Sequence, residues 1–536
     1  MSPRRGTLVE LLTIAGFCAF LFYFGLNTFG LVGADEPRYA QIAREMLDRG
    51  DWVTPTLYGK PWLEKPPLYY WRAMAAYIIF GVSDWSARLP AATAATLMVF
   101  VVYFFARRFL SGAQLNAALM TASSAGVIGF ARGAGTDMQL AATFVIAMLG
   151  WYAWFATKRR LWLAGFYLFL AFGTLSKGPV APLLAVLIIV IFAAVRRDLR
   201  LVWKTLWLPG ILVFLAVVLP WYVAVQLRNS EFFRGFFLEH NFARFATNLY
   251  RHRQPFWYYI PVLFLGVMPW SALVIAGMVE AGRDWRRRAR ENVDTALPAF
   301  LLTWVAVLVV FFSLSMSKLP GYILPAFPPC AMLAANYLRG REQLGWPISV
   351  AQAALSAVLL GATLLYPNIL LHRSGAIPPS AKLVAGGIAA LLFLATLSGL
   401  RRQGTRVLRL VVLAPVIVGL AFLLRVAGPS IDEAFSLRPV AKELDRMGTD
   451  RKQLAVFKAS RIVEYGLAFY ENRGLARYER GEIPAGDHLV VTTEGARAQL
   501  QQRVGARRLS RLGGFPPQRL EYFWVSTPAP TGHLHR

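Results

Sequence analysis

The sequence consists of long apolar stretches that are separated, two at a time, by short clusters of lysine and arginine. The stretches are roughly 17 to 25 residues long, the length of helix that crosses about 30 Å of hydrocarbon. Positive charge marks the cytoplasmic ends of membrane helices, so the breaks between clusters are expected on the opposite side. We therefore predict a mainly helical, multi-pass membrane protein with a cytoplasmic N-terminus. The clusters are residues 4–5, 107–108, 158–160, 196–204, 283–290, 339–341 and 401–406.

Composition supports a membrane protein. Of the 536 residues, 56% are hydrophobic and only 16% are charged, which is unusual for a soluble chain of this length. The net charge of +28 would also suit a nucleic-acid-binding protein, but arginines at helix ends beside anionic lipid account for it better. We expect no nucleic acid partner. Cys18 and Cys330 both lie in apolar stretches, which argues against a disulfide framework or a thiolate metal site.

About thirteen spans are predicted, and an odd number places the two termini on opposite sides of the membrane. The segment 67–82 is apolar but short, begins with two prolines and contains Arg72. Placing it as a helix in the interface keeps every basic cluster on the cytoplasmic side, whereas a further span would invert the later clusters. The predicted spans are 8–32, 86–106, 113–131, 137–157, 161–174, 179–195, 206–226, 257–280, 297–316, 320–338, 347–366, 380–400 and 406–427.

The spans divide the chain into a transmembrane domain, 1–427, and a C-terminal domain, 428–536. The first domain carries two long loops on the non-cytoplasmic side, 33–85 with interfacial helices and 227–256. From about Gly428 the composition becomes that of a soluble protein. A helix over 437–447 and strands over 454–457, 488–493 and 520–525 predict a small α/β domain outside the membrane on that same side.

The first long loop opens with Asp35-Glu36-Pro37-Arg38-Tyr39. Asp35 can cap a helix whose first turn accepts a proline, and an amphipathic pattern follows as far as Gly50. A simple cap would explain one acid, but two acids and Arg38 at a membrane boundary favour catalysis by Asp35 and Glu36. Tyr39 lies on the apolar face beside them.

Further along the same loop, Trp62-Leu63-Glu64-Lys65 precedes two prolines, which stiffen the acid–base pair. We expect Lys65 to hold a phosphate and Glu64 to hold a metal or a hydroxyl, although a surface ion pair would have the same sequence.

Three further charged residues lie at predicted outer turns. Asp137 begins a span, where it could cap the helix or serve as a second catalytic carboxylate. Lys177 and Lys318 each lie in a Ser-Lys turn before a proline. A lysine at a boundary can simply extend to the interface. Positive charge on the outer side runs against the topological bias, however, so both are expected to bind phosphate.

The loop 227–256 contains an aromatic-rich segment in which His240 and Arg244 fall on one helical face. We expect them to contact a metal or a phosphate. Walker, dinucleotide-binding, Gly-x-Ser-x-Gly and zincin motifs are absent, so no nucleotide is expected.

Five motifs together resemble the bacterial transferases that add 4-amino-4-deoxy-L-arabinose to lipid A, and more broadly the dolichyl-phosphate-mannose protein mannosyltransferase family. The resemblance covers about residues 1–340, in the family's order. It implies the C-type glycosyltransferase fold. The motifs are Asp35-Glu36-Pro37-Arg38-Tyr39, Glu64-Lys65-Pro66-Pro67, Arg88-Leu89-Pro90, Glu239-His240 with Arg244-Phe245, and Ser317-Lys318-Leu319-Pro320.

The resemblance also implies an activity: inverting transfer of a sugar from undecaprenyl phosphate to a lipid or glycolipid acceptor, at the periplasmic face of the bacterial inner membrane. By motif, Asp35 is the main catalytic carboxylate and Asp137 a second acid. Donor phosphate contacts come from Arg38, Lys65 and Arg244, and Glu64 with His240 resembles a pair that binds a divalent metal such as Zn, Mg or Mn. Substrate contacts are expected from Tyr39 and from Trp62, which stands where the family has tyrosine.

Two alternatives stay open. A protein O-mannosyltransferase acting on Ser or Thr would share the donor chemistry and the fold. A lipid flippase would place charges deep within helices and show inverted repeats, and neither feature is visible in the sequence.

Overall fold

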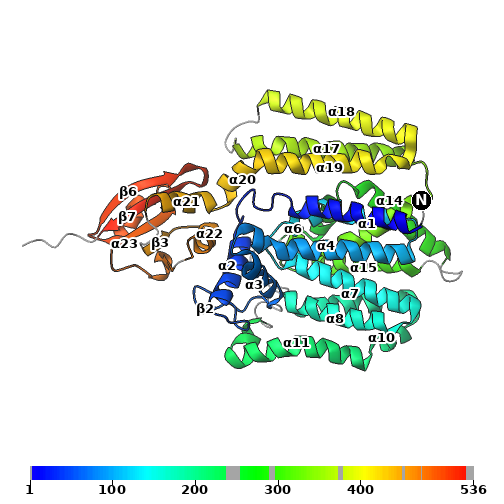
Figure 1. Cartoon of the computed structure of the whole chain (residues 1–536), viewed down its shortest axis with the longest axis horizontal. Helices are drawn as coiled ribbons and strands as arrows, with labels where there is room; N and C mark the ends of the chain where they lie inside the picture. The colour runs from blue at the N-terminus through cyan, green and yellow to red at the C-terminus, as the bar shows by residue number, and fades with distance from the viewer. Residues whose placement is uncertain are drawn as a thin grey trace, which may run out of the picture.

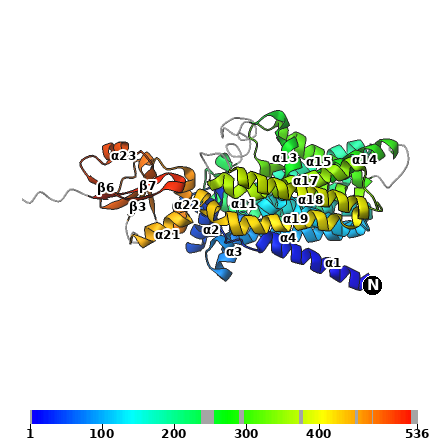
Figure 2. The same cartoon turned by 90° about the horizontal axis from the view of Figure 1, so that it is seen from above.

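The computed structural model describes residues 3–236, 254–288, 296–371, 378–448, 453–472 and 474–526. A bundle of long helices is joined at one end to a small α/β domain (Figure 1). The N-terminus lies at the opposite end of the bundle (Figures 1 and 2). The chain is therefore mainly helical, with a small mixed sheet near its C-terminus.

The helical part is that of a multi-pass membrane protein. Among the described residues, eight helices are long and apolar enough to cross a membrane, and the bent pair Phe256–Gly266 and Ser271–Trp285 would be a ninth. The bundle helices are α1 (Pro3–Cys18), α4 (Asp84–Phe109), α5 (Gln114–Ser123), α6 (Ala125–Ala131), α7 (Asp137–Thr157), α8 (Arg160–Lys177), α9 (Val180–Val195), α10 (Arg200–Thr205), α11 (Leu208–Arg228), α13 (Tyr259–Gly266), α14 (Ser271–Arg288), α15 (Ala296–Leu314), α16 (Phe327–Leu338), α17 (Trp346–Leu371), α18 (Pro379–Gln403) and α19 (Leu408–Phe422).

Several predicted spans are interrupted. The span 113–131 is divided at Ser124 into α5 and α6, and α13 meets α14 at a bend of 114°. The span 8–32 was predicted too long, because α1 and the π-helix that continues it (Ala19–Tyr23) end at Tyr23. The chain then turns through Gly25, whose φ is +65°, a conformation that favours glycine. The carbonyl groups of residues after Tyr23 are no longer needed by the helix, and they accept hydrogen bonds from the buried Arg88 and the partly buried Arg132.

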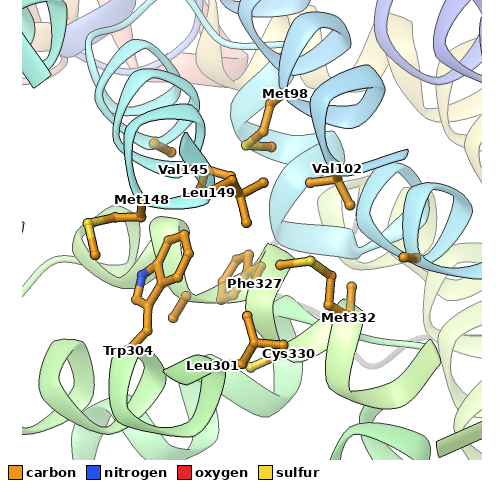
Figure 3. Packing of buried hydrophobic residues seen from close by; sticks show 14 of the residues in the cluster. Met98, Val102, Val145, Met148, Leu149, Leu301, Trp304, Phe327, Cys330 and Met332 are labelled. Atoms are coloured by element: carbon orange, nitrogen blue, oxygen red, sulfur yellow. The ribbon is translucent and has the colours of Figure 1, made fainter. Parts of the chain in front are cut away.

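The centre of the bundle is a closely packed apolar core formed by α4, α7, α15 and α16. Figure 3 shows Trp304 and Phe327 among the aliphatic and sulfur-containing side chains of these helices. A Cβ atom added at Gly126 or Gly266 would lie 2.2 Å from the Phe327 ring, so glycine permits this packing at both positions. Cys330 belongs to this core, as expected from its apolar surroundings.

Between the bundle and the C-terminal domain lies the first long loop. It contains α2 (Asp35–Asp48), a hairpin of β1 (Thr56–Leu57) and β2 (Lys60–Pro61), and α3 (Leu68–Phe80). The amphipathic helix predicted from Asp35 is α2, and its apolar face is buried against α3. The predicted interfacial helix is α3, which packs on both α2 and α4.

The C-terminal domain is a five-stranded mixed sheet of order β4-β3-β5-β7-β6, with β4, β3 and β5 parallel. The three predicted strands and the predicted helix α21 are confirmed, whereas β4, β6, α22 and α23 were missed. Strand β4 has three residues and β6 contains a Gly-Gly pair, so neither shows a clear apolar alternation. The elements are β3 (Gln453–Phe457), β4 (Leu475–Arg477), β5 (His488–Thr493), β6 (Arg508–Phe515), β7 (Leu520–Ser526), α20 (Gly428–Phe435), α21 (Arg438–Arg446), α22 (Arg461–Glu471) and α23 (Arg497–Val504).

Polar contacts fix the C-terminal domain to the residues on either side of the first long loop. Arg438 pairs with Asp84 at 3.0 Å, at the start of α4. The Tyr470 hydroxyl donates to the Asp84 carboxylate at 2.6 Å and accepts from the Leu31 amide at 2.7 Å. In Figure 1, α22 consequently lies beside α2.

Candidate active site

Asp35 occupies the first turn of α2, where the partial positive charge of the helix N-terminus favours a carboxylate. The Arg38 guanidinium, one turn further on, pairs with Asp35 at 2.7 Å. The Asp35 side chain is nevertheless 69% exposed, whereas that of Arg38 is only 11% exposed. The buried Arg38 therefore holds the Asp35 carboxylate in place through one oxygen, Oδ1, while the side chain stays accessible to solvent.

Glu36, the next residue, faces the protein interior. Its carboxylate pairs with the fully buried Arg88 at 2.7 Å and accepts backbone hydrogen bonds from Val32 and Ala134, both at 2.9 Å. Arg88 donates its remaining hydrogen bonds to carbonyls of residues 26–30. This buried ion pair joins α2 to α4 and to the turn that precedes α7.

Three aromatic rings lie close to the Arg38 guanidinium. The guanidinium carbon lies 5.0 Å from the ring centroid of Tyr39, 5.4 Å from Trp62 and 5.6 Å from Tyr465. Such cation–π contacts stabilise a partly desolvated cation by about 0.5–2 kcal/mol each. Because Tyr465 belongs to α22, the C-terminal domain forms part of the site.

The electrostatics of Tyr39 show which charges lie near one another. Burial raises the pKa of its phenol, and the nearby Arg38 guanidinium partly opposes that shift. Three carboxylates act in the same direction as burial: Asp35, Asp137 and Glu64. The structure therefore gathers four of the predicted site residues around a single phenol.

Asp137 begins α7, as predicted, and pairs with Lys177 at 2.5 Å. The Lys177 ammonium also lies 5.1 Å from the Tyr322 ring centroid. The backbone approaches closely here, since a Cβ atom at Gly321 would come within 2.6 Å of the Asp137 carboxylate. Lys177 lies in the last turn of α8, although it was predicted in the turn after that helix.

The other predicted site residues lie in three other segments: the turn after α15, the residues after the β1–β2 hairpin and the loop 227–256. Lys318 is buried, and its ammonium donates to the Ser315 carbonyl at 2.6 Å. Lys65 and Glu64 follow the β1–β2 hairpin and are partly buried. His240 and Arg244 lie outside the described residues.

A metal site is not completed by the part of the chain that the structure describes. Within it, no three side chains of His, Cys, Asp or Glu converge in a way that could hold an ion. Glu64 alone represents the predicted metal pair there, because its partner His240 is not among the described residues. The expected divalent ion stays a prediction.

Some residues of the site were not predicted. Arg88 was noted only as part of a motif, and Tyr322 follows the Ser317–Pro320 turn without having been given a role. Tyr465 had no local signal, because it is an aromatic residue on an ordinary amphipathic helix far along the chain. Only the tertiary fold brings it to Arg38.

Comparison with known proteins confirms the resemblance expected from the motifs. Residues 7–233 match the model of the family dolichyl-phosphate-mannose-protein mannosyltransferase. The chain is 35% identical over 372 residues to an undecaprenyl phosphate-alpha-4-amino-4-deoxy-L-arabinose arabinosyl transferase of Pseudomonas aeruginosa. A relative from Serratia proteamaculans is also 35% identical, over 346 residues. The match covers 68% of this chain but only 64% of the Pseudomonas relative.

The fold is also that of a solved structure. ArnT from Cupriavidus metallidurans, crystallised with undecaprenyl phosphate, superposes with a TM-score of 0.78 at 24% identity, covering 97% of this chain and 99% of that one. An archaeal oligosaccharyltransferase, AglB from Archaeoglobus fulgidus, aligns with a TM-score of 0.50 at 12% identity, over 93% of this chain and 70% of its own. The helical part therefore has the C-type glycosyltransferase fold that the motifs predicted.

Proposed function

We propose that this relative of the undecaprenyl phosphate aminoarabinose transferases moves aminoarabinose from an undecaprenyl phosphate carrier to lipid A. The observation that carries the proposal is the exposed Asp35 carboxylate held by the buried Arg38. The second acid, Asp137, pairs with Lys177 and lies close enough to Tyr39 to raise the pKa of its phenol. The sequence identity to curated transferases points to the same donor and acceptor.

In this reaction the bond between the sugar's anomeric carbon and the carrier phosphate breaks, and an acceptor oxygen forms the new bond from the opposite face. Negative charge accumulates on the departing phosphate. Preorganised cations in a water-poor cleft stabilise that charge, and losing one such contact typically raises the barrier by about 3–4 kcal/mol. Arg38 and Lys177 are held ready for this role by their ion pairs, and we assign Lys65 to the same phosphate.

The role of Asp35 depends on the acceptor. A hydroxyl acceptor needs a carboxylate to remove its proton, and Asp35 is the exposed acid of the site. A lipid A phosphate is already anionic, so Asp35 would then orient the reacting groups and stabilise positive charge that develops on the sugar. Both roles require an accessible carboxylate oxygen.

Glu36 has a different role in this proposal. Its carboxylate is occupied by Arg88 and by two backbone amides. We assign it to positioning, because it fixes the start of α2 against the turn before α7 and thereby sets the spacing of Asp35 and Asp137. The catalytic role that the sequence suggested for Glu36 is better filled by Asp35.

We propose that the thirteen predicted segments all cross a bacterial inner membrane. The shorter and broken helices would then supply the spans beyond the eight or nine that are long and apolar enough by themselves. The N-terminus and the basic clusters then face the cytoplasm. Contacts support this grouping: Thr405 donates to the Arg341 carbonyl at 2.6 Å, and Arg409 donates to Asn116 at 2.7 Å. The candidate site and the C-terminal domain lie at the other end of the bundle, which we place in the periplasm.

The experiment is transfer by the full-length protein, reconstituted in liposomes with undecaprenyl phosphate aminoarabinose and lipid A. Mass spectrometry should detect lipid A carrying the added sugar, and Asp35→Asn should abolish the product without changing the amount of folded protein. Supplying a Ser/Thr-containing peptide with a polyprenyl phosphate mannose tests the alternative. Product in that second reaction alone would reject the proposal.

The expected divalent ion has its own test. Chelation with EDTA, followed by separate addition of zinc, magnesium or manganese, shows whether transfer depends on a metal. Recovery with one ion in wild-type protein, and its absence in Glu64→Gln, would support the predicted metal pair.

A further inference from the structure

A pocket of about 200 Å³ lies between the β1–β2 hairpin and the C-terminal domain, outside the cluster of Asp35, Arg38 and Asp137. Its lining contains no residue of the helical bundle. The hairpin and the residues that follow it form one wall, and α22, β4 and the turn after β4 form the other. The polar and aromatic lining residues are Tyr58, Lys60, Trp62, Glu464, Tyr465, Arg477 and Arg480.

This pocket shares a wall with the candidate active site. Trp62 and Tyr465 line it, and both rings also contact Arg38, at 5.4 and 5.6 Å. A group bound in the pocket would therefore contact two side chains that also contact the Arg38 guanidinium. The pocket is positioned to hold a part of a substrate that does not itself react.

The Trp62 indole nitrogen is an unsatisfied donor. It is buried, and no hydrogen-bond acceptor lies within reach of it among the described residues. A buried polar group without a partner costs about 1–3 kcal/mol, so it is typically satisfied by water or by a ligand. Trp62 lines the pocket, so an acceptor atom of a bound ligand that reached this nitrogen would remove that cost.

The charge of the lining is positive. Three of its charged residues are cations and one, Glu464, is a carboxylate. Glu464 pairs with Arg477 at 3.4 Å, and Arg477 also pairs with Glu482 at 3.0 Å. Lys60 and Arg480 are exposed, and neither has a carboxylate within ion-pair distance in the described parts of the chain.

We infer that this pocket binds a phosphate group of the glycolipid acceptor, with Lys60 and Arg480 as its cations and the Trp62 indole as a hydrogen-bond donor. The inference rests on the proposed function. Cations and a neutral donor around a small pocket suit an anion better than an uncharged sugar. The acceptor is the better source than the donor, because Arg38 and Lys177 already provide for the donor phosphate. The C-terminal domain thereby contributes to acceptor binding.

Binding without turnover tests the inference directly. The full-length protein in nanodiscs, without donor, is titrated with lipid A bearing both phosphates, and native mass spectrometry measures the apparent Kd. Removing two exposed charge-assisted contacts in Lys60→Ala/Arg480→Ala should weaken binding about fivefold. The control Lys442→Ala/Arg497→Ala removes the same charge from exposed positions of the C-terminal domain outside the pocket, and should bind lipid A like wild type.

Two further measurements define the ligand. With the two mono-dephosphorylated forms of lipid A, the pocket variant should behave like wild type for one form, because the phosphate that occupies the pocket is then missing. Trp62→Phe, which keeps the ring and loses the donor, should weaken binding of diphosphorylated lipid A about threefold.

Three outcomes would overturn the inference. Equal weakening for phosphatidylglycerol would show general attraction to anionic lipid, and weakening for undecaprenyl phosphate alone would assign the pocket to the donor. Unchanged lipid A binding in the pocket variant would show that no subsite exists. Failure of the proposed function is a separate result: wild-type protein that binds lipid A through the pocket but transfers no sugar keeps the subsite and rejects the activity.

Discussion

Asp35 and Glu36 are adjacent acids in the same helical turn, yet their surroundings differ completely. The Asp35 side chain is 69% exposed, and its one ion-pair partner in the described structure is the buried Arg38. The Glu36 side chain is only 12% exposed, and its carboxylate contacts Arg88 and two backbone amides. Successive residues of a helix point about 100° apart, so one carboxylate faces the site and the next faces the interior. In the proposed function the two acids of this motif therefore have different roles: Glu36 positions the start of α2 and Asp35 takes part in the chemistry.

The largest effect should come from the exposed acid. Asp35→Asn keeps the size of the side chain and removes its charge, so transfer should fall by up to about 10⁴-fold. The melting temperature should stay close to the wild-type value, because the amide oxygen can still accept the hydrogen bond from the buried Arg38 and the side chain is mostly in solvent. The control is Asp48→Asn, an exposed acid at the other end of α2. Substantial activity in Asp35→Asn would remove the main distinction between the two acids.

The buried acid should instead control folding. Arg88→Ala leaves the Glu36 carboxylate buried without its cation, which typically costs about 3–5 kcal/mol of stability. Thermal unfolding in detergent should show a clearly lower midpoint and a lower yield of folded protein. Replacing both partners with apolar residues, Glu36→Leu/Arg88→Met, should recover part of the loss, because no unpaired charge remains. A wild-type midpoint in Arg88→Ala contradicts the assigned role.

Variants of Lys177 test whether the Asp137–Lys177 ion pair contributes to transfer through its charge, as proposed for Asp35 and Arg38. Lys177→Ala removes the cation beside Asp137, and we expect transfer to fall about 10²-fold through weaker stabilisation of the leaving phosphate. Lys177→Arg should recover more activity than Lys177→Met, since it restores charge. Equal activity in these two variants would assign Lys177 to packing rather than to charge.

The smallest effect should come from the C-terminal domain's contact with Arg38. Tyr465→Ala removes one of three rings around the guanidinium, a loss of about 0.5–1 kcal/mol, so transfer should fall a few-fold. Tyr465→Phe keeps the ring and should behave like wild type. A wild-type rate in Tyr465→Ala would show that the aromatic contact does not contribute to holding Arg38.

The sequence predicted the elements of this site better than its contacts. The helix at Asp35 was recognisable from the proline in its first turn, and the span from Asp137 from the glycine-rich break before it. The predicted capping was wrong, because Asp35 and Asp137 are the first residues of their helices and neither helix has a side-chain cap. The membrane fold followed from apolar length and basic clusters, both of which are local signals.

Contacts between distant residues carried no such signal. The arginine that pairs with Glu36 lies on another helix, and the ring of Tyr465 reaches Arg38 from a different domain. The break between α13 and α14 was also missed, since apolar composition continues through the bend. Which of two adjacent acids faces the site is decided by the rotation of α2 in its packing, and packing is a tertiary property.

The most direct test compares Asp35→Asn with Glu36→Gln in one experiment, measuring single-turnover transfer per folded molecule. We predict that Asp35→Asn is fully folded and nearly inactive, whereas Glu36→Gln yields less folded protein whose remaining folded molecules still transfer sugar. The reverse pattern, with an active Asp35→Asn and a stable but inactive Glu36→Gln, would contradict the assignment of chemistry to the exposed acid and architecture to the buried one.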